Sequence, residues 1–560
     1  MKILWLDINS SYSHSSLALP AIHAQVKEVY EWVVVRGTIK DKPGLLAAKV
    51  ALHKPDIIAS TFWLFTHFMQ LEVLSRAHQL LDDVTIICGG PEFIGDNEDF
   101  LRQHKFIDFV LRGEGEESLP LWLKDYENFA KFEDYDKATS RTKIPGLCWI
   151  SPDGVYIDNG IAKVEDFSSL EYPEESPFFS WDKPFIQLET TRGCFNTCGF
   201  CVSGGDKPVR VQSLEQIAKR LENVYKHGVK DVRVLDRTFN YDIKRACEML
   251  DLFSKYDGKM RFHLEIHPAL LPDRLREKLK SLPSGLLHLE AGIQSLNQKV
   301  LDGCGRKGSL EASLDGLKFL SSLDNVETHA DLIAGLPFYT LEMVKNDVRS
   351  LTEMGVEELQ LESLKLLPGT KMRDEAGLHG LKYSPLPPYE VLKTPHIDEF
   401  ELEVAMQISR MVDFYYNSTP LQKISQKLFT LYPSFILDFT EHLAETGVID
   451  SPLSLERRIL ILYDYCKKVH PEMLIEVSLT WIEAGFSLKK KPAESSVKIK
   501  NLDLFLKEGS WQVKVIYGEM LESHRYYFLA YGDGGYIFGY DSLAHNPSPV
   551  FLAKIFTNNQ

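Results

Sequence analysis

The segment FIQLETTRGCFNTCGFC, residues 185–201, leads from a β-rich run directly into three closely spaced cysteines. Cys194, Cys198 and Cys201 follow a C-x3-C-x2-C spacing, and the next cysteine along the chain is Cys247. Three thiolates from one loop suit an iron–sulfur cluster or a zinc ion. Structural zinc normally has four protein ligands, and no second C-x2-C or histidine pair lies nearby. The spacing therefore favours a [4Fe–4S] cluster in which one iron keeps an open position.

The residues around this loop alternate between strand and helix patterns. Six β-rich runs begin at residues 185, 231, 260, 286, 327 and 359, and helical segments such as 213–228 and 341–355 separate them. Six strands joined by five crossovers predict a partial (β/α)6 barrel over residues 184–398. Because the chemistry of such barrels is found at the carboxyl ends of the strands, we expect the three cysteines at the catalytic face.

Residues 1–125 show a second, shorter alternation. Five β-rich runs begin at Lys2, Glu31, Asp56, Val84 and Phe106. They predict a flavodoxin-like domain, an α/β fold with a doubly wound parallel sheet. Ligands of such sheets bind beyond the carboxyl ends of the strands. Three loops at that edge are rich in small or polar residues, and they start at residues 9, 88 and 112.

The rest of the chain connects or extends these two domains. Residues 126–183 read as a hairpin that turns at Ser151–Gly154, followed by an acidic, proline-bearing linker. Residues 399–560 mix helical and period-two patterns, which predicts an α+β extension without a recognisable motif. The length of 560 residues is consistent with several domains.

Composition excludes some classes of protein. The net charge of −16 argues against a nucleic-acid-binding surface, because phosphate contacts need an excess of lysine and arginine. No stretch of about 18 apolar residues predicts a membrane span, and the start of the sequence lacks a signal-peptide pattern. Eight cysteines are too few for a disulfide framework in a chain of this length. We therefore expect a cytoplasmic protein.

The cysteine loop resembles the signature of the radical S-adenosylmethionine (SAM) superfamily, C-x3-C-x-aromatic-C, with Phe200 as the aromatic residue. The resemblance implies that Cys194, Cys198 and Cys201 hold a [4Fe–4S] cluster whose open iron binds SAM. It also implies that an electron from the cluster cleaves SAM to a 5′-deoxyadenosyl radical. Phe200 is expected to stack on the adenine of SAM.

Five further segments resemble the strand ends that line the SAM pocket in this superfamily. They are LDRTFN from residue 235, HLEIHP from 263, EAGIQS from 290, DLIAGLP from 331 and LLPGT from 366. With the aromatic residue of the cysteine loop, the resemblance implies SAM contacts by Phe200, Asp236, Glu265, Gly292, Gln294, Ser295 and Arg306.

A flavodoxin-like domain before such a barrel resembles the cobalamin-binding branch of the superfamily. This branch is related to the anaerobic Mg-protoporphyrin ester cyclase-like oxidoreductases and includes members with an uncharacterised C-terminal extension. The resemblance implies cobalamin contacts by Ser60, Thr61, Gly89, Gly90, Pro91, Gly113 and Glu114, and Ser10 and His14 in the first loop are further candidates. Methionine synthase and the cobalamin mutases carry D-x-H-x-x-G in the first loop, whereas Asp7 and His14 stand seven positions apart here. The lower axial ligand of cobalt therefore stays open.

The resemblance implies a cobalamin-dependent radical SAM enzyme, and methylation of an unactivated carbon is the leading hypothesis. One alternative is radical cyclisation or rearrangement without methyl transfer, and another is a non-catalytic iron–sulfur redox protein. Cys304 is a further candidate for a catalytic thiol. The expected partners are a small-molecule, lipid or peptide substrate and a reductant such as flavodoxin or ferredoxin.

Overall fold

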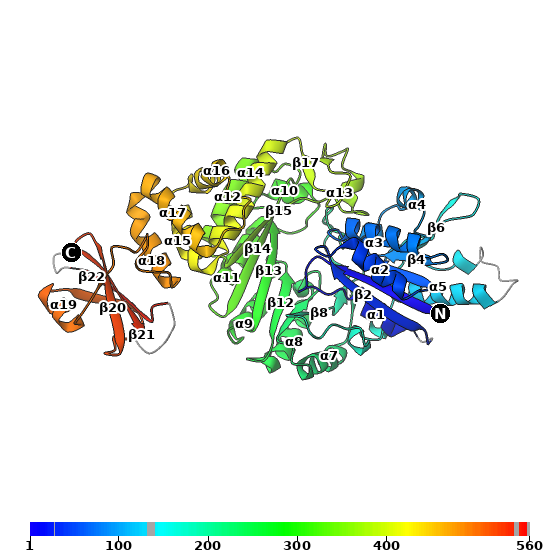
Figure 1. Ribbon diagram of the computed structural model, residues 1–560, viewed down its shortest axis with the longest axis horizontal. Coiled ribbons are helices and arrows are strands. Elements are labelled where there is room, and N and C mark those ends of the chain that lie inside the picture. The colour runs from blue at the N-terminus through cyan, green and yellow to red at the C-terminus, as the bar shows by residue number, and fades with distance from the viewer. Residues whose placement is uncertain (27–28, 132–139, 542–547, 557–560) are drawn as a thin grey trace. The chain divides into compact units, whose positions relative to one another are not determined.

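The computed structural model of the chain describes residues 1–26, 29–131, 140–541 and 548–556 (Figure 1). It divides into two compact units. The first contains Met1–Val344 and Glu362–Leu402, and the second contains Lys345–Leu361 and Glu403–Gln560. Among the described residues, no helix is both long and apolar enough to cross a membrane.

All five strands expected in residues 1–125 form one parallel sheet. They are β1 (Lys2–Asn9), β2 (Glu31–Thr38), β3 (Ile57–Thr61), β4 (Thr85–Gly89) and β5 (Phe109–Leu111). Their order is β2-β1-β3-β4-β5, which is the flavodoxin-like order. The sequence prediction of a doubly wound sheet is confirmed.

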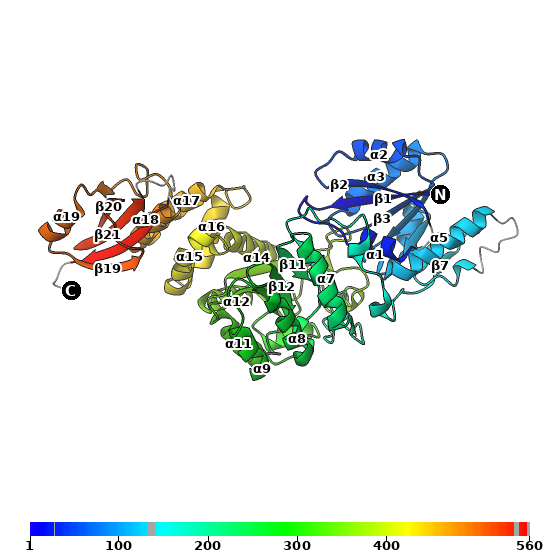
Figure 2. The ribbon, with the colours of Figure 1, turned by 90° about the horizontal axis from the view of Figure 1, so that it is seen from below.

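Successive residues of a strand point to opposite sides of the sheet, and in these strands both sets are apolar. Both faces of the sheet are therefore apolar. In β1, Leu4 and Leu6 pack in one buried cluster, while Ile3 and Trp5 pack in the other. Helices cover the two faces separately, as Figure 2 shows. They are α2 (Pro43–Leu52), α3 (His67–Leu80) and α4 (Glu98–Gln103) on one face, and α1 (Ala18–Gln25) and α5 (Gly115–Lys131) on the other.

The predicted hairpin belongs to this sheet. Strands β6 (Leu147–Ile150) and β7 (Tyr156–Asp158) continue the order beyond β5, and β6 pairs antiparallel to it. The turn is confirmed, because Ser151 N–H donates to Val155 O at 2.8 Å and Gly154 N–H donates to Ser151 O at 2.8 Å. Leu147, Cys148 and Trp149 are buried, so the hairpin shares the core of the first domain, which therefore extends past residue 125.

The six strands expected between residues 184 and 398 also form one sheet. They are β8 (Ile186–Leu188), β11 (Asp231–Val234), β12 (Arg261–Ile266), β13 (Leu287–Gln294), β14 (Val326–Ala334) and β15 (Glu358–Ser363). The order β15-β14-β13-β12-β11-β8 follows the chain, as expected for a partial barrel. The helices between them are α7 (Leu214–Lys226), α8 (Ile243–Phe253), α9 (Asp273–Lys280), α10 (Gln298–Gly303), α11 (Leu310–Ser321) and α12 (Leu341–Glu353).

Short elements complete the first unit. They are β9 (Thr191–Arg192), β10 (Arg210–Val211), α13 (Lys371–Asp374), β16 (Lys382–Tyr383) and β17 (Val391–Lys393). Strands β9 and β10 pair antiparallel, with Arg210 opposite Arg192, and they flank the cysteine loop on both sides.

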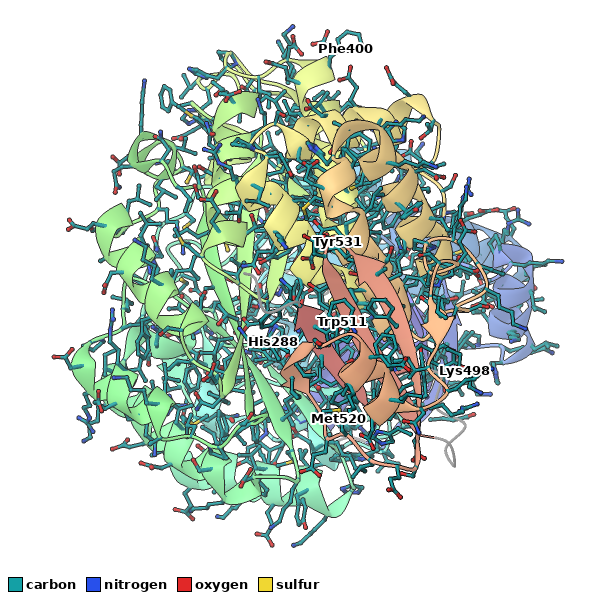
Figure 3. The ribbon with its side chains drawn as sticks, turned by 90° about the vertical axis from the view of Figure 1, so that its left-hand side faces the viewer. His288, Phe400, Lys498, Trp511, Met520 and Tyr531 are labelled. Carbon is teal, nitrogen blue, oxygen red and sulfur yellow. The ribbon has the colours of Figure 1, made fainter. Side chains whose placement is uncertain are left out.

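The second unit is an α+β structure, as the sequence predicts for the extension. Its helices are α15 (Thr419–Leu431), α16 (Phe435–Glu445), α17 (Leu455–Val469), α18 (Leu474–Glu483) and α19 (Leu502–Glu508), and α14 (Glu399–Met411) leads into it. Its antiparallel sheet has the order β18-β20-β21-β22-β19. The strands are β18 (Val497–Lys498), β19 (Gln512–Tyr517), β20 (His524–Tyr531), β21 (Gly534–Asp541) and β22 (Phe551–Phe556). Figure 3 labels Lys498, Trp511, Met520 and Tyr531 on this sheet and beside it.

Candidate active site

The three cysteines lie at the carboxyl end of the barrel sheet, in the loop that β9 and β10 flank. Cys194 and Cys198 are 8% and 6% exposed, and Cys201 is half-buried. All three are free thiols. The sequence prediction that this loop follows the first barrel strand is therefore confirmed by the fold.

Backbone hydrogen bonds fix the shape of this loop. Cys194 N–H donates to Asp206 O at 3.0 Å, Gly199 N–H donates to Cys304 O at 2.8 Å, and Met372 N–H donates to Gly199 O at 2.8 Å. These three bonds tie the loop to segments that lie before β10, after α10 and in α13. The cysteines are thus held by main-chain contacts that do not depend on a bound ion.

Asn196 is a positioning residue that the sequence analysis missed. Its Oδ1 accepts from Lys307 N–H at 2.9 Å and from Thr197 N–H at 2.8 Å. Gly305 contributes from the other side, because a Cβ there would lie 2.9 Å from Thr197 O. Its φ of 71° also favours glycine. In the sequence, Asn196 is only a polar residue between Cys194 and Cys198, and nothing there distinguishes it from an ordinary loop residue.

The donors around the sulfur atoms test whether the loop fits a cluster. Asn196 N–H donates to Cys194 Sγ at 3.4 Å, and Arg306 Nη1 donates to Cys198 Sγ at 3.7 Å. Burial raises the pKa of the Cys198 thiol, and Arg306 counteracts this rise. Burial also raises the pKa of Cys201, and a bond from Ser203 N–H counteracts it. N–H groups aimed at buried sulfurs stabilise thiolates, so the donor set fits an iron–sulfur cluster.

Three of the residues predicted to contact SAM gather beside Cys198. Arg306 donates through Nη2 to the carbonyl of Gly292 as well as through Nη1 to the cysteine sulfur. Gln294 has a φ of 68°, and a Cβ on Gly292 would lie 2.6 Å from its Nε2. The EAGIQS strand end, with its glycine backbone and the Gln294 carboxamide, and the Arg306 guanidinium from the segment after α10 thus meet beside the cysteine loop.

The other predicted SAM contacts are placed differently. Asp236 is buried, and its carboxylate accepts from Thr190 N–H at 2.8 Å, from Thr191 N–H at 2.9 Å and from the Thr190 hydroxyl. These bonds hold the start of the cysteine loop, and the contact of Asp236 with SAM stays a prediction. Ser295 is buried with its Oγ bonded to Asn297 N–H, and Glu265 forms an ion pair with Arg237. Phe200 is half-buried.

The inner face of the barrel sheet is polar, although its outer face is apolar. In β12, Phe262 and Leu264 are buried, whereas the alternate residues His263 and Glu265 are partly exposed. His263 pairs with Glu290 at 2.9 Å across to β13. Such acid–base pairs lining an open strand face can bind the polar groups of a substrate.

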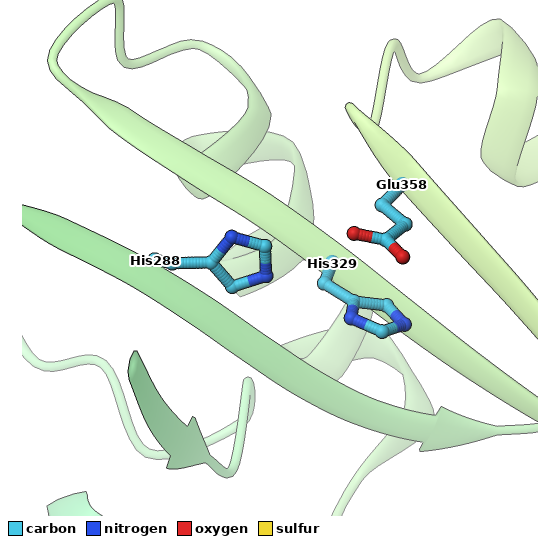
Figure 4. Close-up of side chains that lie close together, drawn as sticks. All are labelled: His288, His329 and Glu358. Carbon is cyan, nitrogen blue, oxygen red and sulfur yellow. The ribbon is translucent and has the colours of Figure 1, made fainter. Parts of the chain in front are cut away.

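Two more histidines extend this inner face across the sheet, because His288 lies opposite His263 and His329 lies opposite Glu290. Figure 4 shows His288 on β13 and His329 on the adjacent strand β14, and their rings lie 5.9 Å apart. His329 pairs with Asp331 at 3.1 Å. Burial lowers the pKa of His288, with smaller effects from His263 and Arg261, so this imidazole is neutral at physiological pH.

A cavity of about 480 Å³, the strand-end cavity, lies between the carboxyl edge of the first sheet and the cysteine loop. Seven of the nine residues predicted to contact cobalamin line it: Ser60, Thr61, Gly89, Gly90, Pro91, Gly113 and Glu114. From the barrel side, Thr191, Arg192 and Gly193 line it. Its volume falls in the range of small-molecule and cofactor sites.

Ser10 and His14 are not among the described residues that line this cavity. His14 is exposed, its Nδ1 is 2.7 Å from Ser11 Oγ, and its ring packs edge-on against Phe185. The structure therefore places the predicted histidine outside the cavity, because the first loop turns its hydrogen bonds back onto itself.

Glu114 lines the cavity, but its carboxylate is already bonded. Arg210 donates to both of its oxygens at 2.8 Å, and Val164 N–H donates to Oε2 at 2.7 Å. Although burial alone raises the pKa of Glu114, the hydrogen bonds from Arg210 and the charge of Arg192 bring it below its ordinary value. The carboxylate is therefore ionised and bonded within the protein, and the contact of Glu114 with cobalamin stays a prediction.

Cys304 lies next to the cysteine loop without joining it. Its thiol donates to Leu301 O at 3.2 Å, and burial raises its pKa to about 12. A thiol with this pKa stays protonated at physiological pH and is a poor nucleophile. The structural contribution of Cys304 is its carbonyl, which binds Gly199 N–H.

His267, the residue after β12, should make the folded protein less stable in acid. It is 4% exposed, its Nδ1 accepts from Ala269 N–H, and its Nε2 therefore donates to Lys307 O. Burial and then Arg306 lower its pKa to about 4. Because the unfolded chain binds this proton first, stability falls as pH drops from about 6.5 toward 4.

We expect acidification from about pH 6.5 to about pH 5 to cost about 1.5 kcal/mol through His267. The variant His267→Gln keeps a donor and an acceptor at this position and lacks that contribution. Urea unfolding of both proteins at the two pH values measures the difference. An equal acid loss in wild type and variant contradicts the prediction.

Three family models match parts of this chain. Residues 188–351 match the Radical SAM superfamily, residues 5–122 match the B12 binding domain, and residues 377–482 match a protein family of unknown function, DUF4080. The first two matches fall on the barrel and on the parallel sheet that form the strand-end cavity.

Several curated relatives are identical to the chain at about a quarter of the aligned positions. An uncharacterised methyltransferase of Pyrococcus horikoshii is 24% identical over 71% of this chain and 87% of its own length. The cobalamin-dependent radical SAM methyltransferase TokK of Streptomyces tokunonensis is 23% identical over 64% of this chain and 54% of its own. The anaerobic magnesium-protoporphyrin IX monomethyl ester cyclase of Cereibacter sphaeroides is 24% identical over 54% of this chain and 50% of its own.

A solved structure shares the fold. The cobalamin-dependent SAM radical enzyme OxsB, with aqua-cobalamin and SAM bound, superposes with a TM-score of 0.60 and 14% identity. The match covers 87% of this chain and 81% of OxsB.

Proposed function

We propose that this chain, which joins a B12-binding domain to a radical SAM domain, transfers a methyl group to a carbon atom of its substrate. The observation that carries the proposal is the strand-end cavity, which the edge of the first sheet and the cysteine loop line together. The relatives that are methyltransferases support the choice of reaction.

Each cofactor has its own set of residues in this proposal. Cys194, Cys198 and Cys201 would hold a [4Fe–4S] cluster, and the group around Arg306 would hold SAM. Ser60, Thr61, Gly89 and the neighbouring residues of the cavity wall would hold cobalamin. When bound, these groups supply the radical that removes a hydrogen atom and the methyl group that replaces it.

The residues of the chain bind, orient and shield these groups. Arg306 stands between Cys198 and Gly292, where its charge offsets negative charge on the cysteine sulfur and can bind a carboxylate. The pairs His263–Glu290 and His329–Asp331 present donors and acceptors to a polar substrate. We further propose that flavodoxin or ferredoxin supplies the electron and that the enzyme works in the cytoplasm.

The cyclase relative supports a second candidate, a radical cyclisation or rearrangement without methyl transfer. It uses the same cysteine loop and the same SAM residues. The two candidates differ in how SAM is consumed, because a methylating enzyme also needs SAM as the source of the methyl group.

Product analysis under reducing anaerobic conditions tests the proposal. We expect the reconstituted protein with cobalamin and SAM to release 5′-deoxyadenosine and S-adenosylhomocysteine, and Cys198→Ala to release neither. Liquid chromatography quantifies both nucleosides. Deoxyadenosine without S-adenosylhomocysteine favours the cyclase-like candidate, and the absence of both contradicts the enzyme assignment.

A further inference from the structure

We infer that Arg210 and Asp206 are positioning residues that couple occupancy of the strand-end cavity to the placement of Cys194. The inference rests on the proposed function, because it takes cobalamin as the occupant of that cavity. It concerns two side chains that touch neither the cysteine sulfurs nor the proposed SAM group.

The link begins at the loop Gly113–Glu116, which lines the cavity. Glu114 in this loop accepts a hydrogen bond from each of the two terminal nitrogens of Arg210, both at 2.8 Å. Two parallel bonds between a guanidinium and a carboxylate fix distance and orientation together. A displacement of the Gly113–Glu116 loop therefore moves the Arg210 guanidinium with it.

A second arginine strengthens this connection. Arg192 stands opposite Arg210 in the β9–β10 pair and contacts Glu116 at 2.6 Å and Glu189 at 2.9 Å. Both arginine side chains are largely buried, with 12% of Arg192 and 6% of Arg210 exposed. Separating one partner from a buried ion pair is strongly destabilising, because it leaves an uncompensated buried charge. The two loops therefore stay paired.

The link ends at the first cysteine. Arg210 Nη2 donates to Asp206 Oδ2 at 3.0 Å, and Lys163 Nζ donates to Asp206 Oδ1 at 2.6 Å. The carbonyl of Asp206 accepts from Cys194 N–H at 3.0 Å. A Cβ on Gly193 would lie 2.5 Å from that same carbonyl, so the two segments are in close contact.

The Gly113–Glu116 loop contacts both the backbone at Ala162 and the two arginines, and it also lines the cavity. A Cβ on Gly113 would lie 2.3 Å from Ala162 O, so the start of the loop packs on backbone, whereas its other side faces the cavity. A ligand that fills the cavity restricts this loop, and the restriction passes through Glu114, Arg210 and Asp206 to the backbone at Cys194. Coupling of this kind needs a contiguous set of bonds, which these contacts provide.

Hydrogen exchange of the reconstituted full chain, with and without hydroxocobalamin, tests the coupling. In the wild type we expect hydroxocobalamin to slow exchange in peptides confined to residues 194–202, none of which lines the cavity, by about tenfold. In Arg210→Gln we expect hydroxocobalamin to bind and this slowing to disappear. Arg210→Lys, which keeps the charge but not the fork, is expected to recover it in part.

Three comparisons separate coupling from simple stability. Arg102→Gln removes an exposed guanidinium paired with Glu98 in the same domain and should leave the cobalamin effect unchanged. Glu114→Gln should match Arg210→Gln, and the double variant should add nothing further.

A purely structural role would raise exchange equally with and without hydroxocobalamin, leaving the ratio of the two exchange rates intact, and that result overturns the inference. Hydroxocobalamin binding by the wild type without loop protection overturns the coupling alone, whereas no binding overturns both the coupling and the proposed cobalamin site.

Discussion

The triple variant Cys194→Ala, Cys198→Ala, Cys201→Ala is expected to hold no iron–sulfur cluster after anaerobic reconstitution, whereas the wild type holds about four irons and four sulfides per chain. The reason is that these three sulfurs are the thiolates that one loop presents with N–H donors aimed at them. Alanine removes the ligands and leaves no other cysteine in the loop. Iron and acid-labile sulfide assays, together with visible absorption, measure the loss.

The variant should still fold, because the bonds that shape the loop come from the backbone and from Asn196. Cys304→Ala is the matched control, since it removes a buried thiol beside the loop and keeps the carbonyl that binds Gly199. We expect it to retain the full cluster. Wild-type iron and sulfide content in the triple variant, or loss of the cluster in Cys304→Ala, contradicts the assignment.

The strands and the cysteine loop could be predicted from the sequence because their signals are local. Each barrel strand is a short run in which alternate residues are apolar, as in β12, and each is followed by a helical period. The spacing of Cys194, Cys198 and Cys201 fixes their common loop regardless of the rest of the fold. Local periodicity and spacing need no knowledge of which distant segments meet.

The partners of charged residues could not be predicted in this way. Glu114 and Arg210 are 96 positions apart, and nothing in either segment indicates the other. Glu114 is assigned to cobalamin because its loop resembles the corrinoid-contacting loops of the family, and no feature of the sequence shows that its carboxylate also bonds to Arg210 and Val164. Asp236 is assigned to SAM because LDRTFN resembles a strand end of the superfamily, and its bonds to Thr190 and Thr191 are likewise not foreseen.

The hairpin illustrates a different limit. Its turn could be predicted from the serine and glycine at its ends, but its place in the first sheet depends on the pairing of β6 with β5. Strand pairing is a long-range property that the sequence of one strand does not specify. The same limit applies to β22, which pairs with both β19 and β21 in the second unit.

The variant Gly89→Phe is expected to lose corrinoid retention, with a dissociation constant for hydroxocobalamin at least about a hundredfold higher than wild type, or about 2.8 kcal/mol. Gly89 ends β4 and lines the strand-end cavity. A Cβ there meets Leu111 O at 3.5 Å, which is ordinary contact, so the fold accepts a side chain at this position. The phenyl ring then takes volume from a cavity of about 480 Å³. Titration followed by visible absorption gives the dissociation constant.

Gly90 is unsuitable for the same experiment. Its φ is 107°, and a Cβ would lie 2.7 Å from Phe62 O, so any substitution strains the backbone before a ligand is involved. Loss of corrinoid in a Gly90 variant would therefore report on folding. The pair Gly89 and Gly90 separates space needed by a ligand from space needed by the chain.

Two controls complete the design at Gly89. Gly89→Ala adds one methyl group and should bind hydroxocobalamin within about threefold of wild type, since a small side chain leaves most of the cavity open. Gly44→Phe places the same large ring on α2, outside the described lining of the cavity, where the nearest atom is the flexible end of Arg76 at 3.4 Å. It should bind like wild type if the fold is intact. A folded Gly89→Phe protein with wild-type affinity means that cobalamin, if it binds this chain, does not occupy the strand-end cavity.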